Sequence, residues 1–223
     1  MSNSSIVSVD TKSGPPHVVL TYDDGPEPVG TQEVLSALSD AQVTATFFVL
    51  LTRTRLSPSL TAEIISQGHE IGLHGVDHRS LIGMSAQAVY ERTRDAKDEL
   101  ENLIGQSIKW FRPPYGQQTP VHVTEIVKTG LIPVLWNVIC RDWEDVTHDD
   151  RLEGVRGIQK PGSILLAHDN IACEPDGVFY DPCPAFSRGH LSRSIIEIIR
   201  EKGFLPCSLA QALEKGEPIW ERN

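Results

Sequence analysis

The chain has 223 residues, of which 39% are hydrophobic and 22% are charged, so it is long enough for one substantial core and lacks the composition of a disordered protein. The formal net charge of -10 argues against nucleic acid or an anionic membrane surface as the main partner, because phosphate-binding surfaces need clustered lysine and arginine. The first 16 residues lack the basic start and apolar stretch of a secretory signal. We therefore expect a cytoplasmic protein, or a secreted one whose signal has been removed. Nothing in the sequence indicates an oligomeric state.

Short apolar runs alternate with amphipathic segments along the chain. Residues 17–22 form an apolar run that ends at an Asp-Gly-Pro turn signal. After it we expect, in chain order, helix 31–40, strand 44–50, helix 59–67, strand 69–74, helix 85–104, strand 108–112, helix 121–128, a strand in the apolar run 131–139, helix 149–159, strand 163–168, helix 192–203 and strand 204–209.

This alternation predicts an α/β protein, because parallel strands need crossover helices between them. Six to eight such units favour a closed or nearly closed barrel over an open sheet. We therefore predict a single (β/α) TIM-like barrel domain over residues 14–223, preceded by a flexible tail over residues 1–13.

Five polar segments follow the apolar runs. They are TYDDGP (21–26), LHGVDH (73–78), FRPPYG (111–116), CRDW (140–143) and LLAHD (165–169). Each lies at the C-terminal end of a predicted strand, and in a barrel these ends form the one face on which active sites are built. We expect the five segments to converge there.

Two histidines in the second segment, His74 and His78, are four residues apart. This spacing places two side chains on one face of a helical turn, within reach of one ion, although such a pair is more often a packing or surface feature. With Asp23 or Asp24 from the first segment, the pair would complete a three-ligand site whose open positions admit water, as hydrolytic zinc sites require. The alternative for the two carboxylates is a helix cap or a solvated turn.

Arg112 precedes two prolines that stiffen the backbone. This segment is either a structural turn, or it pairs Arg112 with a carboxylate and directs the backbone N–H of Tyr115 at a developing oxyanion. His168 is either a rim residue or, beside a carboxylate, a general acid near neutral pH.

Taken in order, the five segments closely resemble the five motifs of the polysaccharide deacetylase family, the carbohydrate esterases of family four that share the nodulation-type chitooligosaccharide deacetylase domain. The resemblance runs from about His17 to Leu213. It implies a distorted (β/α) barrel of seven or eight parallel strands and one divalent metal ion, usually Zn²⁺ and sometimes Co²⁺ or another first-row ion.

The resemblance also implies a role for each polar residue of the motifs. Asp24, His74 and His78 would bind the metal. Asp23 would be the general base and His168 the general acid. The supporting and substrate-binding roles would fall to Arg112, which orients Asp23, to Asp142, which tunes the pKa of His168, to the N–H of Tyr115 at the oxyanion, and to Trp143 and Leu166 around the acetyl methyl group.

Three positions depart from the family pattern. Gly75 stands where Ser or Thr is common, Ile139 stands where a further Asp is common, and Tyr22 replaces the usual Phe. None of the three is an expected ligand, base or acid.

The function that these residues predict is metal-dependent hydrolysis of the acetamide of N-acetylglucosamine units in chitooligosaccharides or peptidoglycan-type glycans. A first alternative is deacetylation or deformylation of a small acylated metabolite or a non-sugar amide. A second is a catalytically silent glycan-binding barrel, which the retention of the base, the acid and the ligands disfavours.

The segment between Asp169 and His190 is long for this family. We expect it either to set substrate choice, as loops on an active face commonly do, or to be an inert insertion. Cys173 and Cys183 bracket part of it and are either free thiols or, in an oxidising compartment, a disulfide.

Overall fold

The structure is a computed structural model that describes residues 4–11, 14–178 and 184–222. Its strands are β1 Ser4–Asp10, β2 His17–Asp23, β3 Thr46–Val49, β4 Glu70–Leu73, β5 Trp110–Phe111, β6 Ile132–Pro133, β7 Val138–Ile139, β8 Ile164–His168, β9 Leu205–Cys207 and β10 Glu217–Arg222. Its helices are α1 Gly30–Ala41, α2 Leu51–Leu56, α3 Pro58–Ser66, α4 Ala86–Ile104, α5 Pro120–Lys128, α6 His148–Arg156, α7 Arg188–Glu201 and α8 Leu209–Leu213, with short turns η1 Pro114–Gly116 and η2 Glu174–Asp176.

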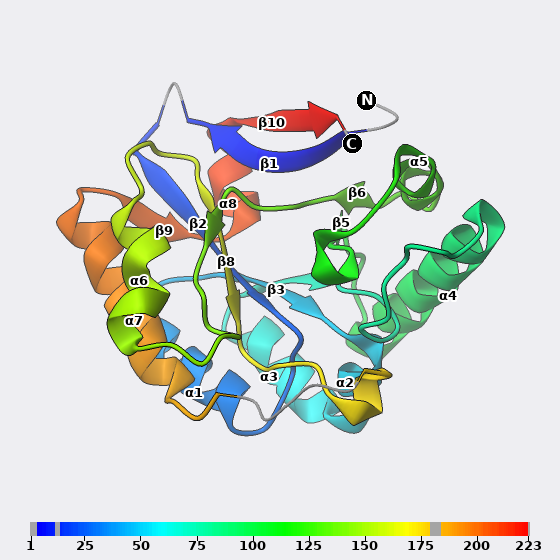
Figure 1. Ribbon diagram of the computed structural model, residues 1–223, viewed down its shortest axis with the longest axis horizontal. Coiled ribbons are helices and arrows are strands. Elements are labelled where there is room, and N and C mark those ends of the chain that lie inside the picture. Colours follow the sequence, from blue (N-terminus) through cyan, green and yellow to red (C-terminus); the bar gives the residue numbers. More distant parts are fainter. Residues whose placement is uncertain (1–3, 12–13, 179–183, 223) are drawn as a thin grey trace.

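One parallel sheet of eight strands forms the centre of the molecule. The strand order is β6-β5-β4-β3-β2-β8-β7, and β9 pairs with the start of β2. The sheet curls into a half barrel with helices around it (Figure 1). The predicted distorted (β/α) barrel in a single domain is therefore confirmed. In the described part of the chain, however, the edge strands β6 and β7 do not pair with each other, so strand pairing does not close the barrel.

The apolar run over residues 131–139 contains two strands, so the prediction of one strand was wrong. β6 pairs with β5 at one edge of the sheet, whereas β7 pairs with β8 at the other. Between them the backbone N–H of Leu135 donates to the Ile6 carbonyl at 2.8 Å, and that of Asn137 donates to the Ile164 carbonyl at 3.2 Å. This segment crosses the open side of the barrel, where Val134 is buried and Leu135 and Trp136 are partly buried.

The prediction of a flexible N-terminal tail was also wrong for residues 4–10. β1 pairs antiparallel with β10, and single bridges join Ile6 to Val134 and Ser8 to Ser163. Ile6 and Val9 are buried in one core cluster, which ties the start of the chain to the ends of β6 and β8. Figure 1 shows the β1–β10 ribbon across one end of the molecule, with α1, α2 and α3 at the opposite end.

Both faces of β2 are buried, and the alternation of its side chains separates two environments. Val18 and Tyr22 pack in the core between the sheet and the helices, whereas Val19 belongs to the second core, which also includes residues of β1 and α8. Because side chains alternate along a strand, Thr21 and Asp23 share the face of Val19. β2 therefore carries two buried polar residues into the interior of the barrel.

The strand register brings the polar segments to one level. Asp23 is in register with Phe48 of β3 and with His168 of β8, and Leu73 at the end of β4 is in register with Phe111 of β5. The expected convergence at the C-terminal face is thus confirmed for these strands. Over the described ranges, no helix is long and apolar enough to cross a membrane.

Candidate active site

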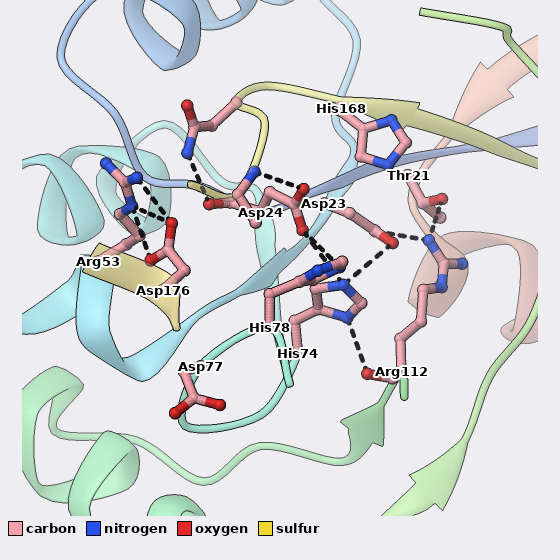
Figure 2. A network of polar contacts seen from close by, with 12 residues as sticks. Thr21, Asp23, Asp24, Arg53, His74, Asp77, His78, Arg112, His168 and Asp176 are labelled. Atoms are coloured by element: carbon pink, nitrogen blue, oxygen red, sulfur yellow. Dashed lines mark hydrogen bonds and ion pairs between the residues drawn. The ribbon is translucent and has the colours of Figure 1, made fainter. Parts of the chain in front are cut away.

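Asp24, His74 and His78 direct one ligand atom each toward a common point (Figure 2). Asp24 Oδ1 lies 3.3 Å from His74 Nε2 and 3.4 Å from His78 Nε2. All three residues are buried. The three predicted ligands are therefore close enough to bind one ion.

The donor set fits a divalent cation. Ligand atoms at about 2.0 to 2.2 Å from a tetrahedral zinc ion are roughly 3.4 Å apart, which agrees with the spacing around Asp24. Asp24 Oδ1 is buried and has no hydrogen-bond partner among the described residues, an expensive state for a carboxylate oxygen unless a cation meets it. His74 Nδ1–H donates to the Arg112 carbonyl at 2.8 Å, which leaves the lone pair of Nε2 for the ion.

The electrostatics of the cluster favour the protonation states that metal binding requires. Burial lowers the pKa of His78 to about 4. Burial alone would raise the pKa of Asp24, but interactions with the imidazoles of His74, His78 and His168 hold that pKa well below its usual range. Asp24 is therefore ionised and His78 neutral at pH 7, as metal ligands must be.

A loop after β4 holds both histidines, so the helical turn expected from their spacing is absent. Gly75 has a φ of 106°, and a Cβ at this position would lie 3.0 Å from the Asp77 carbonyl oxygen. A Ser or Thr would be strained in this conformation, so glycine suits the backbone at position 75. The two histidines thus lie close together as expected, but the helical turn given as the reason was wrong, and their role as metal ligands stays a prediction.

Asp23 is held by Arg112. Arg112 Nη1 donates to Asp23 Oδ1 and to Thr21 Oγ1, both at 2.7 Å, and the guanidinium carbon lies 4.0 Å from the centroid of the Phe48 ring. The other oxygen, Asp23 Oδ2, lies 3.9 Å from His74 Nε2. Arg112 thus leaves one oxygen of Asp23 at the edge of the ligand cluster.

The turn after β2 sends Asp23 and Asp24 in different directions. Asp24 has a φ of 73°, in the left-handed region that Asp and Asn occupy more readily than other side chains. A Cβ on Gly25 would lie 2.0 Å from the Asp169 carboxylate, so only glycine fits. Asp169 accepts a hydrogen bond from Thr31 Oγ1 at 2.5 Å, and burial raises its pKa to about 7. The Asp-Asp-Gly order therefore suits the backbone of this turn.

His168 is paired with Asp142. The ring atom His168 Nδ1 lies 2.7 Å from Asp142 Oδ1, and the backbone N–H of His168 donates to Asp142 Oδ2 at 2.7 Å. Burial alone would lower the pKa of His168, but the charge and hydrogen bond of Asp142 raise it to about 9. The imidazole is therefore cationic near neutral pH, with Nδ1 engaged and Nε2 as the nitrogen that can donate a proton.

The remaining predicted residues surround these groups. Tyr115 has a φ of 60°, and its ring meets that of His78 edge-on with centroids 4.3 Å apart. Trp143 meets the His168 ring edge-on at 5.4 Å. Both aromatic side chains are exposed, whereas Leu166 is buried in β8. Their roles at the oxyanion and the acetyl group stay predictions.

A shallow cleft of about 530 Å³ opens beside Trp143. Val138 and Ile139 of the edge strand β7 line it, and Arg141 and Glu144 stand at its border as an ion pair. Ile139 is 41% exposed at the position where the family commonly has a further Asp. The cleft is thus apolar at this position, although Glu144 and Glu153 also line it.

Tyr22, which stands where the family usually has Phe, has a packing explanation. The Tyr22 hydroxyl donates to Ser192 Oγ of α7 at 3.1 Å inside the core, a bond that Phe cannot make. In the long segment after Asp169, Cys173 is exposed and forms no disulfide with a described residue. Cys183 lies outside the described residues, and with it the predicted choice between thiols and a disulfide.

Sequence reasoning missed three residues that support the site, namely the buried Thr21 and Asp176 and the partly buried Arg53. Thr21 accepts from Arg112, while Arg53 and Asp176 join α2 to the segment over residues 170–176. A threonine in an apolar strand and an Asp before Gly look like ordinary strand and turn residues. No single-sequence signal distinguishes them.

A parallel (β/α) half barrel whose strand ends carry an Asp-His-His cluster, an Arg-bound carboxylate and an Asp-bound imidazole has the features of a metal-dependent hydrolase. The sequence profile of the family described as polysaccharide deacetylase matches residues 10–134. A chitooligosaccharide deacetylase of Sinorhizobium fredii is 34% identical over 206 residues, which cover 89% of this chain and 93% of the relative. The chain belongs to the polysaccharide deacetylase family.

Solved structures share the fold. The crystal structure of the Bc1960 peptidoglycan N-acetylglucosamine deacetylase in complex with an N-hydroxybenzamide compound has a TM-score of 0.80 and 25% identity, covering 96% of this chain and 94% of that one. A family four pseudoenzyme from Bacillus anthracis has a TM-score of 0.78 and 20% identity, covering 96% and 70%. Since this fold occurs in a deacetylase and in a pseudoenzyme, activity depends on the site residues and not on the fold alone.

Proposed function

We propose that this protein is a divalent-metal-dependent deacetylase that hydrolyses the acetamide of N-acetylglucosamine units in chitooligosaccharides or peptidoglycan-type glycans. The observation that carries the proposal is the buried Asp24 Oδ1, which faces Nε2 of His74 and His78 without a hydrogen-bond partner among the described residues. The substrate class follows from the chitooligosaccharide and peptidoglycan deacetylases to which the chain is similar.

Asp24, His74 and His78 would hold the ion. When bound, it would polarise the acetamide carbonyl and make water a better nucleophile. Zinc is our first choice, because two histidines and one carboxylate with an open position form a common catalytic zinc site. Co²⁺ and other first-row ions accept the same donors.

The proton transfers fall to two residues on adjacent strands. Asp23 Oδ2 would take a proton from water as the water oxygen bonds to the acetamide carbon. The Tyr115 N–H would donate to the oxyanion. His168 Nε2 would give its proton to the sugar nitrogen as the C–N bond breaks, so that acetate and the free amine leave. General acid or base groups of this kind contribute about 10²- to 10⁴-fold to the rate.

The alternative substrate, a small acylated metabolite or a non-sugar amide, would use the same chemistry. Trp143, which meets the His168 ring, also lines the cleft of about 530 Å³, so further sugar units of a glycan would have room there. Measurement of kcat/KM on N-acetylated chitooligosaccharides and on small acetamides distinguishes the glycan substrate from the small-amide alternative. Higher kcat/KM on the small acetamides would favour the alternative.

The direct test is acetate release from an N-acetylated chitooligosaccharide with and without a chelator. We expect the chelator to abolish release, and Asp23→Asn to lower kcat by about 10²- to 10⁴-fold while Zn²⁺ binding persists. Asp149→Asn, at an exposed position of α6, is the matched control and should keep full activity. Release that survives both the chelator and Asp23→Asn would overturn the mechanism. Zn²⁺ binding without any release would instead favour the silent glycan-binding barrel.

A further inference from the structure

The segment over residues 170–176 contacts two of the three ligand residues. Asn170 Nδ2 donates to the Asp24 carbonyl at 3.1 Å, and the backbone N–H of Ala172 donates to Asp24 Oδ2 at 3.0 Å. The carbonyl of Asp176 accepts from the backbone N–H of His78 at 2.9 Å. Because Ala172 engages Oδ2, the other oxygen of Asp24 is the one that faces the histidines.

An ion pair between Asp176 and Arg53 holds this segment to helix α2 (Figure 2). Arg53 Nε donates to both carboxylate oxygens, at 2.9 and 3.0 Å, and Nη2 donates to Oδ2 at 2.7 Å. Thr52 Oγ1 and the backbone N–H of Cys173 complete the set at 2.9 and 3.0 Å. The Asp176 side chain is 0% exposed and that of Arg53 is 11% exposed, so salt screens the pair only weakly.

The same helix supports the loop that carries the histidines. The first N–H groups of a helix lack partners within the helix, and in α2 those of Leu51 and Thr52 donate to the carbonyls of Gly75 and Val76 at 3.0 and 2.9 Å. Helix α2 is thus bonded to the ligand loop through its first turn and to the 170–176 segment through Arg53. A substitution at Arg53 or Asp176 would therefore affect the positions of both Asp24 and His78.

We infer that Arg53 and Asp176 are positioning residues for metal binding. They fix the 170–176 segment so that Ala172 occupies one oxygen of Asp24 and the other stays directed at the histidines. Neither residue is placed to touch substrate. The inference rests on the proposed function, because it requires that the Asp24 site bind a divalent ion. Residues that orient metal ligands typically change metal affinity by about 10- to 100-fold.

The experiment measures Zn²⁺ affinity of the full chain by competition with a chromogenic chelator. We expect Asp176→Asn to raise the Zn²⁺ dissociation constant by about 10- to 100-fold, and Arg53→Lys to raise it less, because lysine keeps the charge but not the two-nitrogen contact. At saturating Zn²⁺, kcat should return to the wild-type value. The matched control is Glu99→Gln, which weakens an exposed ion pair of the same helix α2. In that pair, the side chain of Arg55 is 47% exposed and that of Glu99 is 41% exposed. It should leave Zn²⁺ affinity unchanged.

Two outcomes would overturn the inference. One is a wild-type Zn²⁺ dissociation constant in an Asp176→Asn protein that still unfolds cooperatively. The other is a loss of kcat that excess Zn²⁺ does not restore. If Asp176→Asn does not fold, Arg53→Lys decides by the same two measurements. A wild-type chain that neither binds Zn²⁺ nor releases acetate would contradict the proposed function instead, so the two failures are distinguishable.

Discussion

Arg112 and Asp23 form an ion pair almost completely removed from solvent, with Nη1 and Oδ1 2.7 Å apart and side chains 0% and 2% exposed. The other guanidinium nitrogens donate to backbone carbonyls, Nε to Val134 at 3.2 Å and Nη2 to Leu135 at 3.0 Å. A buried pair of this kind costs desolvation energy that its own contacts must offset, and the loss of one partner leaves the other charge uncompensated.

Replacement of Arg112 by Met should therefore destabilise the protein strongly. We expect the free energy of unfolding to fall by about 3 to 5 kcal/mol, measured by urea denaturation. Arg55→Met is the matched control, because it removes an exposed arginine–carboxylate pair with Glu99. Its effect should be below about 1 kcal/mol. Similar losses from the two substitutions would contradict a special role for the buried pair.

Asp142→Asn should lower the pKa of His168. In the wild type, Asp142 raises this pKa to about 9 against the effect of burial, and an amide supplies no negative charge to do so. NMR titration of the His168 ring in the metal-free protein measures the change. Asp145→Asn, which alters an exposed carboxylate three residues away, is the control and should leave the pKa of His168 unchanged. An unchanged pKa in Asp142→Asn would show that other groups hold the proton on His168.

The same pair should make stability depend on pH. Because the folded-state pKa of about 9 lies above the usual 6.5, the contribution of His168 is fully present below about pH 6.5 and is lost as the pH rises through 9. This shift corresponds to about 3 kcal/mol. The stability difference between wild type and Asp142→Asn should shrink by about that amount from pH 6 to above pH 9, in denaturation measured without metal.

The barrel and the strand ends of the site were predictable because β2, β4 and β8 are apolar runs followed at once by polar residues. One parallel face then collects Asp23, His74 and His168 whatever the details of the loops. The pairing of β1 with β10 was not predictable, because it joins residues at opposite ends of the chain and Ile6 and Val9 show little periodicity in so short a segment.

Local geometry within the site was also beyond the sequence. A spacing of four residues suits a helical turn or a loop, and here the positive φ of Gly75, 106°, belongs to a loop. Arg53 and Asp176 are distant in sequence, and α2 is too short to give a helical periodicity. The support of Asp24 by the 170–176 segment therefore becomes visible only in three dimensions.

Gly25→Ala should disturb the Asp24 turn. A Cβ there would lie 2.0 Å from the Asp169 carboxylate, so the backbone or Asp169 must move, which typically costs about 1 to 3 kcal/mol. Gly83→Ala is the control, because Gly83 has no atom within 4 Å of the added Cβ, although its φ of 91° makes the substitution costly for the backbone. Both substitutions should lower stability in urea denaturation, but only Gly25→Ala should weaken Zn²⁺ binding. Equal Zn²⁺ affinity in the two variants would show that the turn tolerates the displacement.

Zn²⁺ should raise the unfolding temperature, because only the folded chain brings Asp24, His74 and His78 together. At a free concentration of 100 times the dissociation constant, the stabilisation is about 2.7 kcal/mol. For a chain of this size that amounts to roughly 5 to 10 °C in calorimetry, and a chelator should reverse it. His78→Ala should remove the shift, whereas His148→Ala should keep it, although His148 is stacked on His190 with ring centroids 4.5 Å apart and forms a second histidine pair. A shift that persists in His78→Ala and disappears in His148→Ala would place the ion at the α6–α7 pair, and the buried Asp24 Oδ1 would then require a different partner.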